Sequence, residues 1–165
     1  MFQLNDQDLT FVDKFTHLGH LITADVTDDA DIRQRRNVLI GQINKLLCHF
    51  GKLDIVTKTR LFLAYCSYCS SHYGAELWDL DCPALDAYGA VWRTGLRRIW
   101  HLPFNTHGIL VSLVSLTVPV LDTIRQRFVN FMNSCLSSPN ELVTYIIRHS
   151  IYGLADALTH CEKPV

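Results

Sequence analysis

The sequence predicts a mainly α-helical fold, in which a short N-terminal β-hairpin or strand cap (residues 1–26) precedes a compact, bundle-like domain of five to six helices (residues 27–165). Apolar residues recur every three or four positions through most of the second region, which is typical of helices packed on one side. Short alternating segments and turn-forming residues are confined to the first region. No repeat, low-complexity tract or linker divides the chain further.

The composition is that of a globular chain, with 48% apolar and 19% charged residues, and 165 residues suffice for one domain with a core. Fifteen Lys and Arg oppose 16 Asp and Glu, so no global field would attract nucleic acid or an anionic membrane. Any such role must therefore depend on local clusters of charge. The mean hydropathy of +0.12 suggests an apolar face that further polypeptide covers, or alternatively a tightly packed helical domain.

The N-terminus lacks the basic region and the apolar run of a signal peptide, and no apolar stretch reaches 18 residues. We therefore expect a protein that is not secreted, has no membrane partner and resides in the nucleus or the cytoplasm. In such a reducing compartment we expect the cysteines to be buried free thiols. The six cysteines are Cys48, Cys66, Cys69, Cys82, Cys135 and Cys161.

The first region is predicted to contain a hairpin and a third strand. Residues 2–4 and 9–12 flank the turn-forming stretch 5–8, which is typical of a hairpin. Residues 17–23 are predicted to form the third strand, in which Gly19 indicates a bulge or a close approach of other backbone. Three strands of this length need a helix beneath them, or a sheet from elsewhere.

Two helices are expected next, each with a capping residue at its start. Thr27 is expected to cap the first, whose acidic first turn suits the helix dipole, and Gly51 ends it. Asp54 caps the second, which ends or kinks at Gly74. The side chains predicted to be buried are Ile32, Leu39, Ile43, Leu46, Leu47 and Phe50 in the first helix, and Thr59, Phe62, Tyr65, Cys66, Cys69 and Tyr73 in the second.

A third helix is expected between Asp81, its cap, and Pro103, with Pro83 tolerated in its first turn. Its apolar positions step by three and four, which predicts one buried face. The side chains predicted to form that face are Leu85, Tyr88, Trp92, Leu96, Ile99 and Trp100.

The remaining third of the chain is predicted to be helical as well. Residues 109–116 are very apolar, and we interpret them as a helix, with a buried strand as the alternative. A longer helix begins at Pro119 and is broken by residues 137–140. Residues 141–149 and 151–161 are predicted to form the last two helices.

Three clusters contain the residue types of metal sites, and each has a simpler interpretation. Cys66, Cys69 and His72 share a helical face, but no fourth zinc ligand accompanies them, so we interpret the cysteines as core thiols rather than as part of a metal enzyme. His17 and His20 lie three apart in the predicted strand and should point to opposite faces. Helix capping and dipole compensation explain the third cluster, Asp28, Asp29 and Asp31. We therefore predict no metal and no other cofactor for this chain.

Basic side chains are better candidates for a functional surface. Arg93, Arg97 and His101 are spaced by four on the third helix and form one stripe. Beside tryptophans, such a stripe can follow a phosphate backbone and support base stacking, whereas the alternative is a solvated helix face. The candidate nucleic-acid-binding residues are Arg33, Arg36, Lys45, Arg93 and Arg97.

Four motifs occur in a characteristic order. Residues 12–22 read VDKFTHLGHLI, residues 31–36 open a basic helix, residues 73–78 read YGAELW, and residues 106–140 carry spaced histidine, proline and aromatic positions. In this order they resemble the region that follows the catalytic core in reverse transcriptases of LINE-type non-LTR retrotransposons. The resemblance covers about residues 9–148 and implies the primer-grip strand, the thumb and the post-thumb region of such an enzyme.

The resemblance implies that Phe15, Leu18 and Gly19 lie near a primer end, and that the basic residues contact an RNA template paired with a DNA primer. Two departures bear on this. His17 replaces the aromatic residue that precedes Leu-Gly in the family, and no proline stands near Cys69, where the family often has one.

The family's catalytic palm, with its Tyr-x-Asp-Asp turn, precedes this region, and nothing in the chain matches it. Because polymerisation needs carboxylates that hold two metal ions, we expect a non-catalytic fragment that is inactive alone. Mg²⁺ is expected only in a complete parent enzyme, the missing palm is an expected partner, and no small-molecule substrate is expected. The alternative is a helical structural or interaction module, decayed or domesticated, without a nucleic-acid role.

Overall fold

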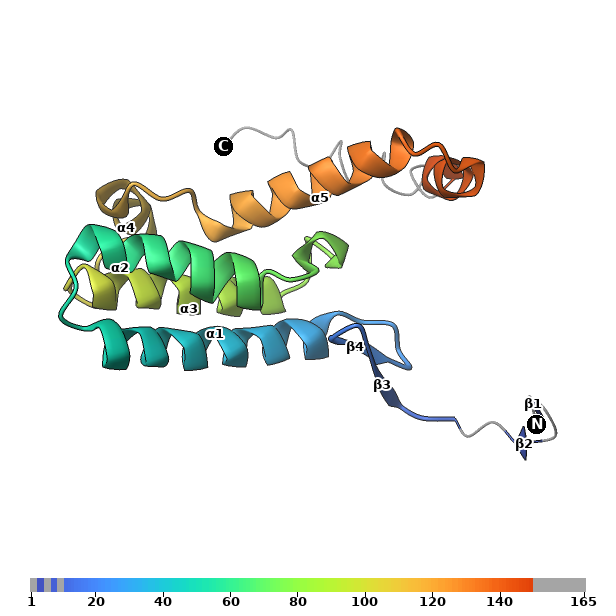
Figure 1. Cartoon of the computed structure of the whole chain (residues 1–165), viewed down its shortest axis with the longest axis horizontal. Coiled ribbons are helices and arrows are strands. Elements are labelled where there is room, and N and C mark those ends of the chain that lie inside the picture. Colours follow the sequence, from blue (N-terminus) through green and yellow to red (C-terminus); the bar gives the residue numbers. More distant parts are fainter. Residues whose placement is uncertain (1–2, 5–6, 9–10, 150–165) are drawn as a thin grey trace.

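The computed structural model describes residues 3–4, 7–8 and 11–149. Within them the fold is mainly α-helical, with short antiparallel strands before the helices, as predicted (Figure 1). The elements are β1 (Gln3–Leu4), β2 (Gln7–Asp8), β3 (Lys14–His17), β4 (His20–Thr23), α1 (Asp29–Phe50), α2 (Ile55–Leu61), the π-helix η1 (Phe62–Ser71), the 3₁₀-helix η2 (Ala75–Leu77), α3 (Ala84–Ile99), α4 (Gly108–Ser115), α5 (Val120–Leu136) and a last helix at 141–149.

The boundaries of the first predicted hairpin are wrong. β1 pairs with β2, which lies inside the stretch predicted to be the turn. Of the predicted second strand 9–12, residues 11 and 12 are not in a strand, and residues 9 and 10 lie outside the described residues. Turn and strand propensities predict the bounds of such short strands poorly, because backbone hydrogen bonds define these strands more than side-chain packing does.

The predicted third strand is in fact a second hairpin, formed by β3 and β4. Leu18 and Gly19 form its two-residue turn with φ of 49° and 83°, and positive φ at both positions matches the twist of the flanking strands. The chain reverses there, so His17 and His20 lie directly opposite each other and share one face of the hairpin. The prediction that they point to opposite faces is therefore wrong.

Two of the three predicted helix caps are wrong. Asp54 does cap α2, since its carboxylate accepts a hydrogen bond from the Thr57 N–H at 2.9 Å. In contrast, the N-cap position of α1 is held by Asp28 and not by Thr27. The start of α3 follows Pro83, and the predicted cap Asp81 instead donates its own N–H to Asp79.

The core lies where α3 packs against α1 and η1, with η2, α4 and the start of α5 closing its edges (Figure 1). Burial of each large apolar side chain there stabilises the fold by roughly 1.5–3 kcal/mol. The predicted faces of α1 and α3 are confirmed, with Leu47 and Trp100 partly buried at the edge of the core, except at Phe50, which is 47% exposed. The buried apolar side chains are Ile32, Leu39, Ile43, Leu46, Phe62, Cys66, Ala75, Trp78, Leu85, Tyr88, Trp92, Leu96, Ile99, Val111, Val120 and Ile124.

The π-helix η1 changes which side chains of the predicted second helix are buried. Tyr65 and Tyr73 are about half exposed, so their predicted burial is wrong. Ser67, Ser71 and His72 are buried instead. Hydrogen bonds in a π-helix join residues five apart, so the buried face recurs at a longer interval than in an α-helix. The side chain of Cys69 lies outside the described residues.

Four cysteines have described side chains, and all four are free thiols. Only Cys66 is buried; Cys82 and Cys135 are partly buried and Cys48 is exposed, so the prediction of buried thiols holds for one of the four. Cys48 is exposed because it lies on the side of α1 that faces away from the buried Leu46.

The helices after α3 agree with the predicted ones. α4 is a helix and not a strand, and only the first half of α5 packs on the core; its second half projects beyond the bundle (Figure 1). The predicted helix 151–161 lies outside the described residues. No single helix in the described part of the chain has both the length and the apolar composition to span a membrane; α4 and α5 meet that test only as a pair, bent by 74°.

Candidate nucleic-acid interface

Asp31 is the residue that joins the β3–β4 hairpin to the helices. Its carboxylate is buried and accepts hydrogen bonds from the Leu21 N–H at 3.0 Å and the Trp78 indole N–H at 2.9 Å, and it lies 3.1 Å from Nδ1 of His20. Burial raises the pKa of the Asp31 carboxyl, but these hydrogen bonds outweigh burial and hold the pKa below 3.8. The Asp31 carboxylate thus connects α1, in which it lies, with β4 and with the segment after η2.

Each distinctive residue of the motif YGAELW has a packing role. Tyr73 stacks on His20 with ring centroids 5.5 Å apart. Gly74 lies so close to the His20 ring that an added Cβ would be 1.9 Å from it. Glu76 accepts two hydrogen bonds from Arg127 of α5, at 2.9 and 3.1 Å, and Trp78 donates to Asp31. The motif therefore fixes the hairpin and α5 to the bundle.

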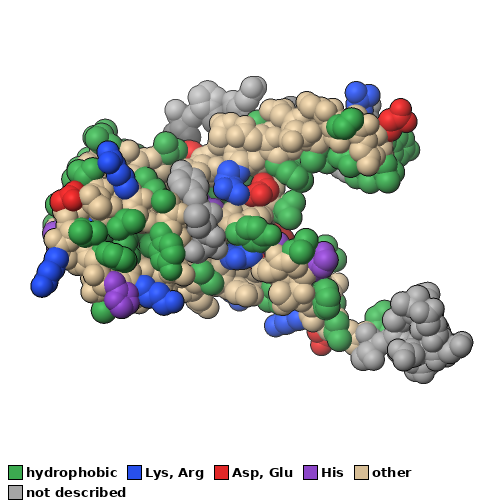
Figure 2. All heavy atoms as spheres, in the orientation of Figure 1, with side chains coloured by type: hydrophobic (Ala, Val, Ile, Leu, Met, Phe, Trp, Pro, Cys, Tyr) green, Lys and Arg blue, Asp and Glu red, His purple; other side chains and the backbone are tan. Residues whose placement is uncertain are grey.

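The hairpin presents the three primer-grip-like residues together. Phe15 and Leu18 are 59% and 74% exposed, and the carbonyl of Gly19 accepts a hydrogen bond from Arg35 at 2.7 Å. The guanidinium of Arg35 also lies over the ring of Tyr73, 5.4 Å from its centroid. The tip is thus held from the helix side while its apolar side chains face outward. Figure 2 shows the molecule hollowed between this hairpin and the projecting half of α5.

Arg93 and Arg97, two of the predicted nucleic-acid contacts, line one pocket of about 580 Å³. Its walls come from α3, the loop at 104–107, the first turn of α4 and the start of α5. Arg125 and His107 line it too, so three arginines line the pocket, and Asp122 is the one acidic residue among the lining residues. A pocket of this size suits a small ligand or part of a larger one, and its charge favours an anion.

The three arginines of the pocket are held differently. Arg97 is fixed, because it donates two hydrogen bonds to the carbonyl of Thr106, at 2.7 and 3.2 Å. Arg125 pairs with Asp122 at 3.3 Å in an exposed contact worth little to stability. Arg93 has no hydrogen-bond or ion-pair partner among the described residues. Its guanidinium is therefore free to bind an anion.

A second hollow of about 460 Å³ adjoins the first, since Arg97 and Phe104 line both. Arg98 and His101 face this second hollow from the same helix. Phe104 is 84% exposed and lies beside Arg97, whose guanidinium carbon is 6.0 Å from the ring centroid. A basic track with an exposed aromatic ring at its middle therefore runs along this side of α3.

The other three predicted contacts do not join this track. Arg33 pairs with Asp29 on the surface of α1 at 3.3 Å. Arg36 lies toward the packed side of the helix, with its Nε buried. Lys45 is exposed and follows Arg36 by nine residues, which in an α-helix places the two on opposite sides. On the face seen in Figure 2, basic side chains are likewise scattered among apolar and neutral groups.

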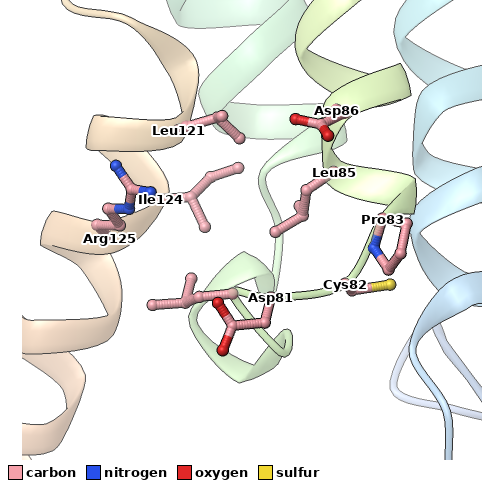
Figure 3. A pocket seen from close by; sticks show the side chains of 9 residues that line it. Asp81, Cys82, Pro83, Leu85, Asp86, Leu121, Ile124 and Arg125 are labelled. Carbon is pink, nitrogen blue, oxygen red and sulfur yellow. The ribbon is translucent and has the colours of Figure 1, made fainter. Parts of the chain in front are cut away.

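An acidic hollow of about 300 Å³ lies next to the basic pocket (Figure 3). Asp81 and Asp86 line it from the loop before α3 and from the start of α3, and Arg125 lines it from α5. Leu85 and Ile124 lie between the two sides (Figure 3). Arg125 therefore lines both the acidic hollow and the basic pocket.

The residues of the three clusters that contain metal-ligand types make other contacts in the structure. The carboxylate of Asp28 accepts the Asp79 N–H at 2.6 Å, and that of Asp29 pairs with Arg33. Burial raises the pKa of the Cys66 thiol to about 11, and it lowers the pKa of His72 to about 4, with nearby Arg127 adding to the effect. The described residues contain no group of three His, Cys, Asp or Glu side chains that could hold a metal ion. They therefore do not fit the site of a polymerase, in which carboxylates hold Mg²⁺.

Sequence reasoning found Arg93 and Arg97 but missed the residues opposite them. Phe104, His107 and Arg125 lie in three segments whose proximity depends on how α4 and α5 fold back on α3. Comparison of the chain with family models, with curated proteins and with solved structures finds no match.

Proposed function

We propose that this chain is the thumb-like, non-catalytic part of a LINE-type RNA-directed DNA polymerase, and that it binds an RNA template–DNA primer hybrid without sequence preference. The basic track along α3 supports the proposal and is the single observation on which it depends most. Arg93, Arg97 and Arg98 supply positive charge along one side of α3, and Phe104 offers a ring on which a base can stack. The catalytic carboxylates and their metal ions would belong to the palm of the parent enzyme.

The β3–β4 hairpin would hold the primer end in this proposal. The hydrogen bonds to the Gly19 carbonyl and from the Leu21 N–H anchor the hairpin that carries the exposed Phe15 and Leu18. Apolar side chains on a rigid hairpin can pack against sugars and bases, whereas the arginines bind phosphates. The two surfaces together would bind a hybrid by its backbone and shape.

Fluorescence anisotropy with a labelled RNA–DNA hybrid at low salt tests this function. Wild-type affinity should fall steeply as salt rises, because bound phosphates release counterions. The double variant Arg93→Gln/Arg98→Gln should bind roughly tenfold more weakly, with a salt slope smaller by about one for each lost phosphate contact. The control Arg60→Gln/Arg148→Gln removes equal charge from exposed positions outside the track. No binding at low salt, or equal loss in both double variants, contradicts the function.

A second candidate function is a structural or interaction module, and exposed apolar side chains on α4 favour it. Ile109, Leu113 and Leu116 are exposed and line a hollow of about 430 Å³ with Val118. A cluster of apolar groups of this kind marks a surface for other polypeptide. If the purified chain is monomeric and does not bind a hydrophobic dye, this second function loses its basis.

A further inference from the structure

We propose that the pocket lined by Arg93, Arg97 and Arg125 receives a terminal phosphate group of a nucleic-acid strand, with the terminal base on Phe104. The inference rests on the proposed function, and it adds a specific preference for phosphorylated strand ends. The shape of the pocket is the first reason. Four segments of chain surround it, so a strand can end there more easily than it can pass through.

The charge of the pocket suits a phosphomonoester. Three arginines and one carboxylate residue, Asp122, line the pocket, and Asp122 already pairs with Arg125. A terminal phosphate carries up to two negative charges and three acceptor oxygens, whereas a phosphodiester within a strand carries one charge. Arg93 has donors free for those oxygens, and its planar fork matches phosphate geometry.

The start of α4 adds donors beside Arg93. The first N–H groups of a helix have no partner inside the helix and carry partial positive charge. His107 accepts the N–H of Ile109 through Nδ1 at 3.4 Å, which leaves Nε2 as the nitrogen that carries the proton. Gly108 brings bare backbone close to Arg93, since a Cβ there would lie 3.0 Å from Cδ of Arg93. The arginine and the helix start thus face the same space.

Phe104 sets the path of the strand. The ring is exposed and borders both the pocket and the second hollow, which Arg98 and His101 line. A strand that ends at Arg93 would stack its last base on this ring and continue past Arg98. The pocket volume of about 580 Å³ exceeds what a bare phosphate needs and admits part of a nucleotide.

The experiment compares four hybrids by fluorescence anisotropy. One carries hydroxyl ends, two carry a terminal phosphate at a 5′ or a 3′ end, and one has hydroxyl ends but an additional internal base pair, whose two phosphodiesters match the charge. We expect one phosphorylated version to bind roughly tenfold more tightly than the charge-matched hybrid, as one charged hydrogen-bonded contact implies. The version that binds more tightly identifies the strand end.

Variants assign the preference to the pocket. Arg93→Gln should abolish it, whereas Arg98→Gln should weaken all hybrids without changing their ratio, and the exposed Arg60→Gln should leave affinity and ratio unchanged. Circular dichroism checks the folding of each variant. If Arg93→Gln does not fold, Ser112→Asp provides the test instead. It adds a carboxylate to the pocket wall and should also abolish the preference.

Equal affinity for phosphorylated and charge-matched hybrids overturns this inference and leaves the proposed function intact. Absence of hybrid binding overturns both. Adenosine monophosphate is the competitor that separates a strand end from a free nucleotide. If it binds the pocket while no hybrid shows a preference for phosphorylated ends, the pocket is a mononucleotide site and the inference fails.

Discussion

At the scale of single residues, Asp31 does more for the fold than its place in the first turn of α1 implies. Asp31→Ala would leave the Leu21 and Trp78 N–H groups without an acceptor in a buried place. Each orphaned donor costs roughly 1–3 kcal/mol, so we expect the free energy of unfolding to fall by about 3 kcal/mol. Urea unfolding followed by tryptophan fluorescence measures the loss. Asp86→Ala, an exposed acid in the first turn of α3, is the control and should cost less than about 1 kcal/mol. Similar losses in both variants would contradict the role of Asp31.

His72 gives the protein a pH dependence at mildly acidic pH. Burial first, and then Arg127, lower its pKa from 6.5 to about 4 in the folded state. The unfolded chain therefore binds the proton more readily than the folded chain. The contribution of His72 to the free energy of unfolding is fully present above pH 6.5 and is lost as the pH drops from 6.5 to 4. We expect a loss of about 3 kcal/mol across this interval, measured by urea unfolding at several pH values.

His72→Gln should remove most of this slope, because glutamine does not titrate. The exposed His17→Gln should keep the wild-type profile. A slope that persists in His72→Gln would assign the pH dependence to another group. Asp31 does not interfere, because the stabilisation from its lowered pKa is fully present above pH 3.8 and is lost only below that value, as the pH falls through the folded-state pKa.

At the scale of elements, two glycines in helices predict opposite results of one substitution. Gly95 lies where α3 meets α1 and η1, and an added Cβ would be 2.8 Å from Ile43 and 2.9 Å from Phe62. Gly95→Ala should therefore destabilise the protein by roughly 1–3 kcal/mol through overpacking. Gly41→Ala in α1 meets nothing within 4 Å and should stabilise it by roughly 0.5–1 kcal/mol. Thermal unfolding compares the two variants, and a stable Gly95→Ala would contradict the close packing.

The π-helix is the element whose packing the sequence predicted least well. α2 and η1 were predicted as one helix, and Phe62 and Cys66 are buried as expected. Beyond Cys66 the wider turn brings Ser71 inward, where its hydroxyl donates to the Cys66 carbonyl at 2.8 Å and accepts from Tyr88 at 2.7 Å. A pattern read at 3.6 residues per turn does not detect such a change in interval.

At the scale of the whole molecule, α4 exposes an apolar face that no other described element covers. Ile109 and Leu113 are 72% and 66% exposed, whereas Val111 of the same helix is fully buried. Ile109→Ser/Leu113→Ser should reduce binding of a hydrophobic dye and any self-association, with little change in unfolding free energy. Val111→Ser is the matched control and should destabilise the fold by roughly 2 kcal/mol or more. Unchanged dye binding in the double variant would exclude this face as the apolar surface.

Contacts were predicted on α1 and α3, and only those on α3 line the pocket. Spacing by four identified Arg93 and Arg97, because side chains four apart share a face of any regular helix. Phe104 and Arg125 carry no local signal, since each looks like an ordinary exposed residue in its own segment. Arg36 and Lys45 were grouped because they are close in the sequence, yet they lie on opposite sides of α1.

Local sequence patterns were enough to predict which described segments are helical, where the breaks at Gly51, Pro103 and Pro119 fall, and which faces of α1 and α3 are buried. These properties follow from periodicity and from the backbone limits of glycine and proline, which act over a few residues. Three relations could be seen only in the folded chain: Asp31 joins the hairpin to Trp78, η1 buries Ser71, and Arg125 lines the same pocket as Arg93. Those relations join residues distant in the chain, and packing of whole helices sets them.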